Sequence, residues 1–254
     1  MKKKISDIST DIFRNVHEKG FFHLFSANVL IQLFAFMSQL FVAGILSPDD
    51  IGRIRIIQTF LSIFSVIASL GFNTSTLKLC SGPEVSQIES NRVFRSGIFF
   101  TLISSIGFYV IILLLNSWDL LSRDTYVRYF IPIGLFPVIT NSLFFVFVAY
   151  TQATKQIRLM SKLTIINKLL SIVAIILFTY GFGLSGYFWA YNISLILIVL
   201  FCFYFFRRVL FVEKDRIRSA KSIRQDLNKH TQYAKPSVLA NLFAEISAYI
   251  DIVL

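Results

Sequence analysis

The chain has 254 residues, of which 55% are hydrophobic and 15% are charged, and its formal net charge at pH 7 is +11. Soluble domains carry roughly 25% charged residues, so this composition excludes an ordinary soluble domain. The positive charge does not point to nucleic acid, because an excess of Lys and Arg is also typical of the cytoplasmic loops of membrane proteins. We therefore expect an all-α integral membrane protein that contacts membrane lipids and binds no nucleic acid.

The first 20 residues are largely polar, but Ile5, Ile8, Ile12 and Val16 recur at steps of three and four residues. The spacing of these four side chains places them on one face of a helix. A helix with one apolar face and nearby basic residues is typical of a segment that rests on a membrane surface. Residues 1–20 are therefore predicted to form a cytoplasmic amphipathic segment.

Six long apolar runs follow, at residues 21–46, 54–77, 94–115, 128–150, 163–180 and 184–206. A run of about 20 apolar residues is long enough to cross the hydrocarbon core as a helix. Pro48 and the two acids after it end the first run and open the second. Pro132 and Pro137 predict a kink in the fourth run, where neighbouring helices must satisfy the freed carbonyl groups. We expect residues 21–206 to form one six-helix transmembrane bundle.

Gly181, Gly183 and Gly186 form a Gly-x-Gly-x-x-Gly pattern between the fifth and sixth runs. A nucleotide-binding fold needs a strand before this pattern and an acidic residue about 20 positions after it, and both are missing here. The glycines instead predict a tight turn between two helices. The three histidines lack metal-ligand spacing, and no nucleophile motif or phosphate-binding loop occurs. We therefore expect neither an enzyme nor a bound metal or cofactor.

The most charged stretch, residues 207–232, predicts a basic cytoplasmic linker. An apolar run opens at residue 233, and its segment Leu242-Phe243-Ala244 repeats Leu33-Phe34-Ala35 of the first run. Transporters are often built from two repeats with the substrate path between them. We expect residues 233–254 to be the first helix of a second bundle, most of which this chain lacks.

The basic residues predict the orientation of the bundle. With six spans, every Lys and Arg falls on the same side as the N-terminus except Arg53, Arg55, Arg123 and Arg128. Because Lys and Arg accumulate in cytoplasmic loops, this asymmetry predicts a multi-pass protein of the bacterial cytoplasmic membrane with its N-terminus inside.

Polar side chains within apolar spans indicate either contacts between helices or a substrate cavity, because hydrocarbon tolerates them poorly. The polar residues of the first span share one stripe, and both explanations fit them equally well. Lysines near the inner ends of spans can also extend to the membrane interface. The substrate-cavity candidates are Asn28, Gln32, Gln39, Arg53, Arg55, Lys78, Lys168, Glu245 and Asp251.

Four short motifs occur in a specific order along the chain. They are Leu46-Ser47-Pro48-Asp49-Asp50-Ile51-Gly52, Leu70-Gly71-Phe72-Asn73-Thr74, Gly183-Leu184-Ser185-Gly186-Tyr187, and Pro236 followed by Asp251. In these motifs the chain resembles the N-terminal part of the polysaccharide-export flippases (O-antigen and teichoic-acid transporters) of the multidrug/oligosaccharidyl-lipid/polysaccharide (MOP) superfamily. The resemblance implies a MATE-like V of two six-helix bundles, of which this chain supplies half.

The same resemblance implies a function. The protein would flip a polyprenyl-pyrophosphate-linked oligosaccharide repeat unit across the cytoplasmic membrane for the biosynthesis of O-antigen lipopolysaccharide, capsule or teichoic acid. An H⁺ or Na⁺ gradient would be a candidate driving force. A polysaccharide polymerase and other proteins of the assembly pathway would be candidate partners.

Three alternatives remain open from the sequence. The first is a cation-coupled multidrug exporter of the same superfamily, and the second is a non-functional fragment. The third is a membrane polysaccharide polymerase, which would need a large outer loop with His, Arg or Asp residues. The longest outer loop predicted here covers only residues 116–125.

Overall fold

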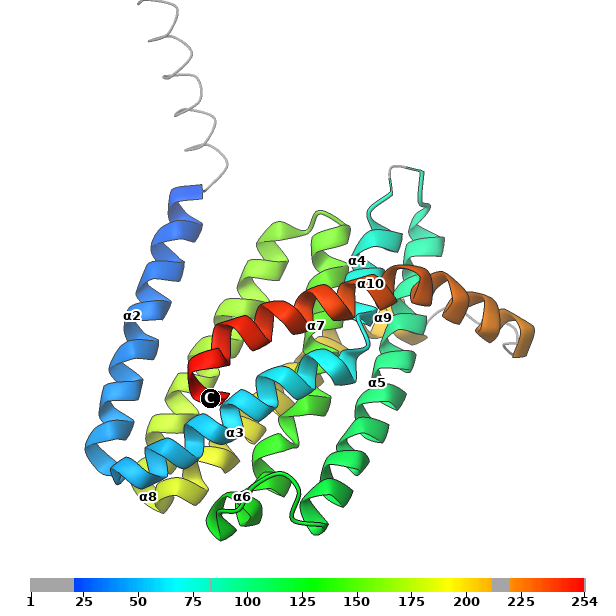
Figure 1. Ribbon diagram of the computed structural model, residues 1–254. Coiled ribbons are helices and arrows are strands. Elements are labelled where there is room, and N and C mark those ends of the chain that lie inside the picture. The colour runs from blue at the N-terminus through cyan, green and yellow to red at the C-terminus, as the bar shows by residue number, and fades with distance from the viewer. Residues whose placement is uncertain (1–20, 83, 212–219, 254) are drawn as a thin grey trace, which may run out of the picture.

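The computed structural model describes residues 21–82, 84–211 and 220–253, and helices account for most of them (Figure 1). No strand occurs among these residues, which confirms the all-α prediction. The predicted amphipathic segment at 1–20 lies outside the described residues. The helices are α2 (Phe21–Ile45), α3 (Pro48–Ser69), α4 (Phe72–Cys80), α5 (Gln87–Ser117), α6 (Thr125–Leu135), α7 (Pro137–Ala153), α8 (Ile157–Phe205), α9 (Arg207–Phe211) and α10 (Ala220–Val253).

Four helical stretches among the described residues are long and apolar enough to cross a membrane. They are Pro48–Ser69, Gln87–Ser117, Thr125–Ala153 and Ile157–Phe205, and a shorter apolar helix covers Val29–Ile45. The last stretch consists of two helices that meet at Gly183, whose φ of +59° lies in the left-handed region. The predicted runs 163–180 and 184–206 lie before and after this residue. The Gly-rich pattern is thus a helix junction, since glycine adopts such a φ without steric cost.

Helix α3 starts as its sequence predicts. The Ser47 side-chain oxygen accepts a hydrogen bond from the Asp50 N–H at 3.2 Å, and Pro48 occupies the first helical position. Both features favour a helix N-terminus, as do Asp49 and Asp50 in the first turn. The end of the helix differs from the prediction of one continuous run at 54–77. Leu70 and Gly71, with φ values of +44° and +70°, separate α3 from α4.

The proline-containing span breaks where the sequence indicates. Helix α6 ends at Leu135 and α7 begins at Pro137. Pro137 has no N–H to donate to the Ile133 carbonyl, which instead accepts a hydrogen bond from the Asn192 side-chain amide at 2.9 Å. The Tyr109 hydroxyl donates to the Pro132 carbonyl at 2.7 Å. Neighbouring helices therefore satisfy the carbonyl groups at this break, as predicted.

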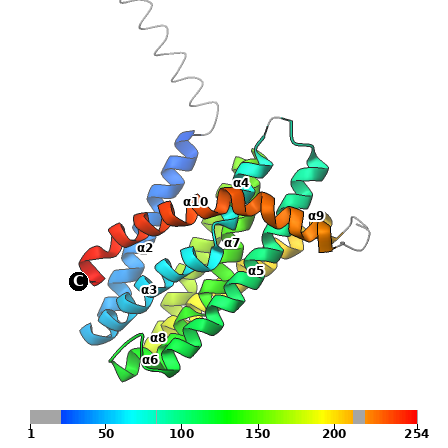
Figure 2. The ribbon, with the colours of Figure 1, turned by 45° about the vertical axis from the view of Figure 1, so that its right-hand side comes forward.

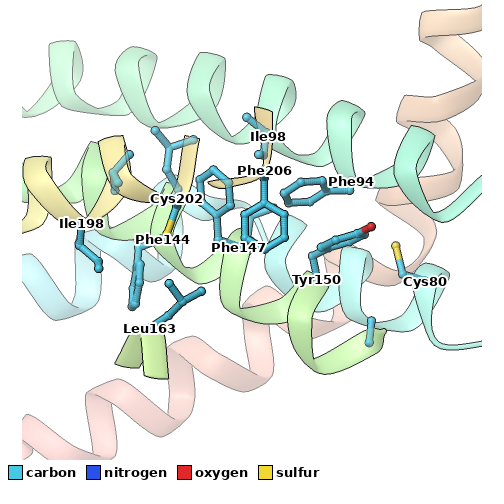
Figure 3. Close-up of a cluster of buried hydrophobic side chains, with 14 of the residues drawn as sticks. Cys80, Phe94, Ile98, Phe144, Phe147, Tyr150, Leu163, Ile198, Cys202 and Phe206 are labelled. Carbon is cyan, nitrogen blue, oxygen red and sulfur yellow. The ribbon is translucent and has the colours of Figure 1, made fainter. Parts of the chain in front are cut away.

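Two apolar clusters hold the helices together. One lies among α4, α5, α7 and α8, where Phe94 stacks on Tyr150 with ring centroids 4.0 Å apart and Phe147 and Phe206 pack against them (Figure 3). The other is built from α2, α3, α6 and α8, with Ile112 of α5 and Val138 of α7. In the first cluster, the edge-to-face pairs of Phe94 with Phe147 and with Phe206, whose ring centroids lie 5.5 Å and 5.7 Å apart, contribute about 0.5–1.5 kcal/mol each beyond burial. The clusters fix the relative positions of α2, α3 and α8, which enclose the site described below.

Helix α10 lies obliquely across α3 and α4, as both ribbon views show (Figure 2). It runs without interruption from Ala220 to Val253. The predicted boundary between a linker at 207–232 and a further helix from residue 233 therefore lies within one helix. The domain boundaries themselves remain predictions.

Candidate functional site

A cavity of about 220 Å³ lies between α2, α3 and both halves of α8. Half of its lining is apolar, with Ala, Val and Ile side chains from all three helices. Polar groups converge on it from the same helices. These are Ser38, Gln39, Arg55, Gln58, Ser171, Tyr187 and Tyr191. An apolar pocket with a few convergent polar groups is the usual form of a small-molecule site.

Arg55 is the one charged side chain among the described residues that line this cavity. The turn at Ser47 joins α2 to α3, and Gln39 and Arg55 each stand eight residues from it. At 1.5 Å per residue, both therefore lie roughly 12 Å from the turn. The Arg55 Nη2 atom donates to the Gln39 Oε1 atom at 3.5 Å, and the Arg55 side chain is exposed. The guanidinium thus keeps donors free for a ligand.

A second polar pair joins α3 to the later half of α8. The Gln58 side-chain amide donates to the Tyr187 hydroxyl at 2.6 Å. Because this hydroxyl accepts from Gln58, its own proton is free to be donated elsewhere. Tyr191 lies one turn further along α8 and also lines the cavity. The site therefore combines one cation with several neutral hydrogen-bonding groups.

Arg53, only two residues from Arg55, has different surroundings. Its guanidinium lies 2.9 Å from an Asp50 oxygen and 3.2 Å from an Asp124 oxygen, and it stacks over the Tyr126 ring at 4.4 Å. Desolvation raises the pKa of Asp124, but its hydrogen bonds with the Tyr126 N–H and with Arg53 outweigh this effect and hold the pKa below its ordinary value. Arg53 thus ties α3 to the start of α6 and does not line the cavity.

The remaining sequence candidates are spread over the molecule. Gln32 on α2, Lys78 on α4 and Lys168 on α8 are exposed, Glu245 on α10 is partly buried, and none of them lines the cavity. Asn28 and Asp251 lie in α2 and α10, but their side chains are outside the described part of the structure. Of the nine candidates, the structure brings Gln39 and Arg55 together.

Sequence reasoning missed Ser38, Gln58, Ser171, Tyr187 and Tyr191. Signals were available for two of them, because Ser38 adjoins Gln39, and Gln58 follows Arg55 by three positions and so shares its helix face. The others come from the two halves of α8, and only the turn at Gly183 and the packing of that helix against α2 and α3 reveal their proximity. Within residues 21–82, 84–211 and 220–253, no group of three or more His, Cys, Asp or Glu side chains could hold a metal ion.

The polysaccharide biosynthesis protein family matches residues 18–254 of this chain. The chain belongs to this family. No curated protein matches the sequence. Membership in this family, together with the apolar spans, identifies a multi-pass membrane protein of the MOP superfamily.

Solved structures of transporters share the fold. A MATE protein in complex with Br-NRF has a TM-score of 0.69 at 20% identity, over 88% of this chain and 53% of the other. A MOP superfamily transporter from Pyrococcus furiosus, described as having a binding pocket of reverse polarity, has a TM-score of 0.68 at 19% identity, over 89% and 51%. An outward-facing multidrug resistance MATE family transporter has a TM-score of 0.63 at 20% identity, over 88% and 52%. At these identities the similarity establishes the MATE-like fold, and this chain spans about half the length of each structure.

Proposed function

We propose that this protein takes part in flipping a polyprenyl-pyrophosphate-linked oligosaccharide repeat unit across the bacterial cytoplasmic membrane, with its N-terminus in the cytoplasm. Family membership supports a role in the assembly of a surface polysaccharide such as O-antigen, capsule or teichoic acid. The single observation that carries the proposal is the cavity whose one charged lining residue, among those described, is Arg55.

The chemistry of the cavity fits a phosphorylated sugar. A guanidinium binds phosphate oxygens through two parallel hydrogen bonds, and these charge-assisted bonds are stronger than neutral ones. Gln39 places the Arg55 guanidinium at the α2 side of the cavity. Gln58 and Tyr187, with free acceptor and donor groups, match the hydroxyl groups of a sugar. In this proposal the polyprenyl tail stays in the surrounding lipid, and no covalent step is needed.

A cation-coupled multidrug exporter is the main competing function. A cationic drug would meet the Arg55 charge in this cavity and would find no carboxylate among its described lining residues. Like charges at short range repel, and more strongly in surroundings of low dielectric constant. The cavity therefore favours an anionic substrate. We also propose coupling to an H⁺ or Na⁺ gradient and cooperation with a polymerase. Neither proposal depends on the cavity.

The test replaces Arg55 in the chromosomal gene by Ala and by Lys. We expect Arg55→Ala to lower surface polysaccharide at least tenfold and to accumulate the lipid-linked repeat unit in the inner leaflet. Arg55→Lys keeps the charge but loses the paired hydrogen bonds, so an intermediate loss is expected. Immunoblots of surface polysaccharide and mass spectrometry of extracted lipids give the two readouts.

Lys168→Ala is the matched control, because this lysine is an exposed cation on α8 one turn from the cavity-lining Ser171. It should export normally. Normal polysaccharide in Arg55→Ala cells that contain the protein at its usual level would refute the proposed role of the cavity. A change in resistance to cationic drugs with unchanged polysaccharide would favour the exporter instead.

A further inference from the structure

Helix α10 packs very closely on the break between α3 and α4. A Cβ atom added to Gly71 would lie 2.4 Å from the Ser237 Oγ atom and 2.6 Å from the Ala234 carbonyl oxygen. Such distances are too short for real side chains, so only glycine allows this approach. Leu70, the residue before it, holds a left-handed φ of +44°, which costs about 1–2 kcal/mol for a residue with a side chain. The middle of α10 thus rests on this break and on the adjoining parts of α4 and α5, a contact surface that we call the seat.

One turn before this contact, His230 of α10 is enclosed between α4 and α5, with 1% of its surface exposed. Its Nδ1 atom lies 2.7 Å from the Ser75 Oγ atom, and its Nε2 atom lies 3.0 Å from the Ser96 Oγ atom. The rings of Phe72 and Phe100 meet the imidazole edge-on, with centroids 5.7 Å and 5.9 Å away. Both ring nitrogens are therefore satisfied while apolar rings exclude water.

This environment suits a neutral imidazole. A neutral ring donates through one nitrogen and accepts through the other. One serine therefore accepts from the ring, and the other turns its proton to the ring from its bond with the Phe72 or Val93 carbonyl. A second proton would make both nitrogens donors and would place a charge among aromatic rings. An unpaired buried charge is costly, even when its hydrogen bonds survive.

The charged groups around His230 are already engaged or lie elsewhere. Asp226, one turn earlier on α10, lies 3.0 Å from the Arg92 guanidinium of α5, and Lys229 pairs with Glu89 of α5 at 3.3 Å. Arg95 of α5, beside Ser96, donates to the Asn91 carbonyl at 3.4 Å. Lys78 on α4 is exposed, as are Arg224 and Lys235 on α10. The charged residues of α3 lie in its first two turns, roughly 24 Å from Gly71 at 1.5 Å per residue.

We infer that His230 is a latch that holds α10 on the α3–α4–α5 seat while its ring is neutral, and that protonation of this ring releases the helix. The proposal is independent of the substrate of the transporter. It assigns a conformational role to the polar half of α10, which lies outside the four candidate spans. The two ion pairs with α5 orient this half, and the His230 ring determines whether it stays seated.

The direction of the pH effect follows from the burial of His230. Desolvation lowers the pKa of His230 to about 4, against the raising effects of the Val93 carbonyl and Asp226. In water an imidazole has a pKa near 6.5, so the released helix binds a proton more readily than the seated one. The seated arrangement is therefore fully favoured above pH 6.5 and loses stability as pH falls toward 4. Between pH 7.5 and pH 5 the released population should rise roughly 30-fold.

Thiol labelling of the protein in its native membrane tests the latch. Ala234 lies in the seat and is 3% exposed, whereas Gln232, two residues away, is exposed. Ala234→Cys and Gln232→Cys are each made in a background with Cys80→Ala and Cys202→Ala, and their maleimide labelling rates are measured from pH 7.5 to pH 5. The ratio of the two rates removes the intrinsic pH dependence of the thiol. We expect this ratio to rise at least tenfold as the pH falls.

Two substitutions of His230 separate the latch from a purely structural role. His230→Gln keeps both hydrogen-bonding functions without a titratable group, so its ratio should stay low at every pH. His230→Lys carries a permanent charge and should give a high ratio already at pH 7.5. A ratio in the native-His protein that does not change with pH, or the same rise in His230→Gln, would overturn the proposal. Hydrogen–deuterium exchange of the backbone amides of residues 224–237, with rates corrected for the intrinsic effect of pH, makes the same comparison without cysteine substitutions. Its result replaces the labelling result if Ala234→Cys itself disturbs the packing of α10.

Discussion

The cavity around Arg55 and the seat around His230 both place polar side chains at helix contacts, but in opposite states. In the cavity, Arg55 is exposed and shares one long hydrogen bond with Gln39. In the seat, His230 is enclosed, and each of its ring nitrogens has a serine partner within 3.0 Å. The first arrangement leaves donors free beside empty space. The second leaves neither space nor donors free.

This difference indicates what each region does. Polar groups with unused donors beside a cavity are available to a ligand, whereas enclosed and fully paired groups define a unique packing arrangement. Substitutions in the cavity should therefore change transport more than stability, and substitutions in the seat should change stability and the position of α10. The following predictions test this contrast, from the largest expected effect to the smallest.

Gly71→Ala should have the largest effect on stability. The new methyl group would meet the Ala234 backbone and would stand at a left-handed φ of +70°. The left-handed conformation alone costs about 1–2 kcal/mol, and the overlap with α10 adds to it. We expect a clear fall in the thermal unfolding temperature of the detergent-solubilised protein, measured by fluorescence-detected size exclusion.

Gly44→Ala is the matched control for this change. Gly44 lies in α2 with no atom near its Cβ position and no left-handed φ, so alanine should be neutral or stabilising there. Equal unfolding temperatures for Gly71→Ala and the unchanged protein would show that α10 does not rest on the α3–α4 break.

Asn192→Leu should lower the free energy of unfolding by about 1–3 kcal/mol, because the Ile133 carbonyl beside Pro137 would lose its donor. The cavity substitution Gln39→Leu provides the contrast. It removes a polar group that faces open space and should leave the unfolding temperature nearly unchanged while reducing polysaccharide export several-fold. Thermal unfolding and export are measured for both. If Gln39→Leu proved the more destabilising of the two, the distinction between the regions would fail.

Asp226→Asn should have the smallest effect, below about 1 kcal/mol. The Asp226 side chain is 8% exposed, but asparagine keeps its shape, and the Arg92 side chain left without this charge is 45% exposed and stays solvated. The seat should hold at pH 7.5, so the labelling of Cys at position 234 should stay slow. Rapid labelling in this variant would show that the ion pair, and not His230, holds α10 in place.

Much of the fold could be predicted from the sequence, since apolar runs, prolines and Gly183 each act locally. The break at Leu70-Gly71 was missed because Leu70 carries no signal for a left-handed φ, although Gly71 after it is a residue that often ends a helix. Asp50, three positions before Arg53, was a local sign that this arginine is ion-paired. The second partner, Asp124, is brought to Arg53 by the tertiary fold, and Arg55 is left facing the cavity. The enclosure of His230 was likewise not predictable, because it depends on serines contributed by α4 and α5.

The central claim is that Arg55 binds the phosphate part of a lipid-linked sugar, and a binding measurement tests it most directly. A short-chain polyprenyl pyrophosphate is titrated into the purified protein by isothermal calorimetry, with Arg55→Ala and Lys168→Ala measured alongside. We predict at least tenfold weaker binding for Arg55→Ala, about 1.4 kcal/mol or more, and unchanged binding for Lys168→Ala. Equal affinities for Arg55→Ala and the unchanged protein would contradict the assignment of this cavity to the pyrophosphate.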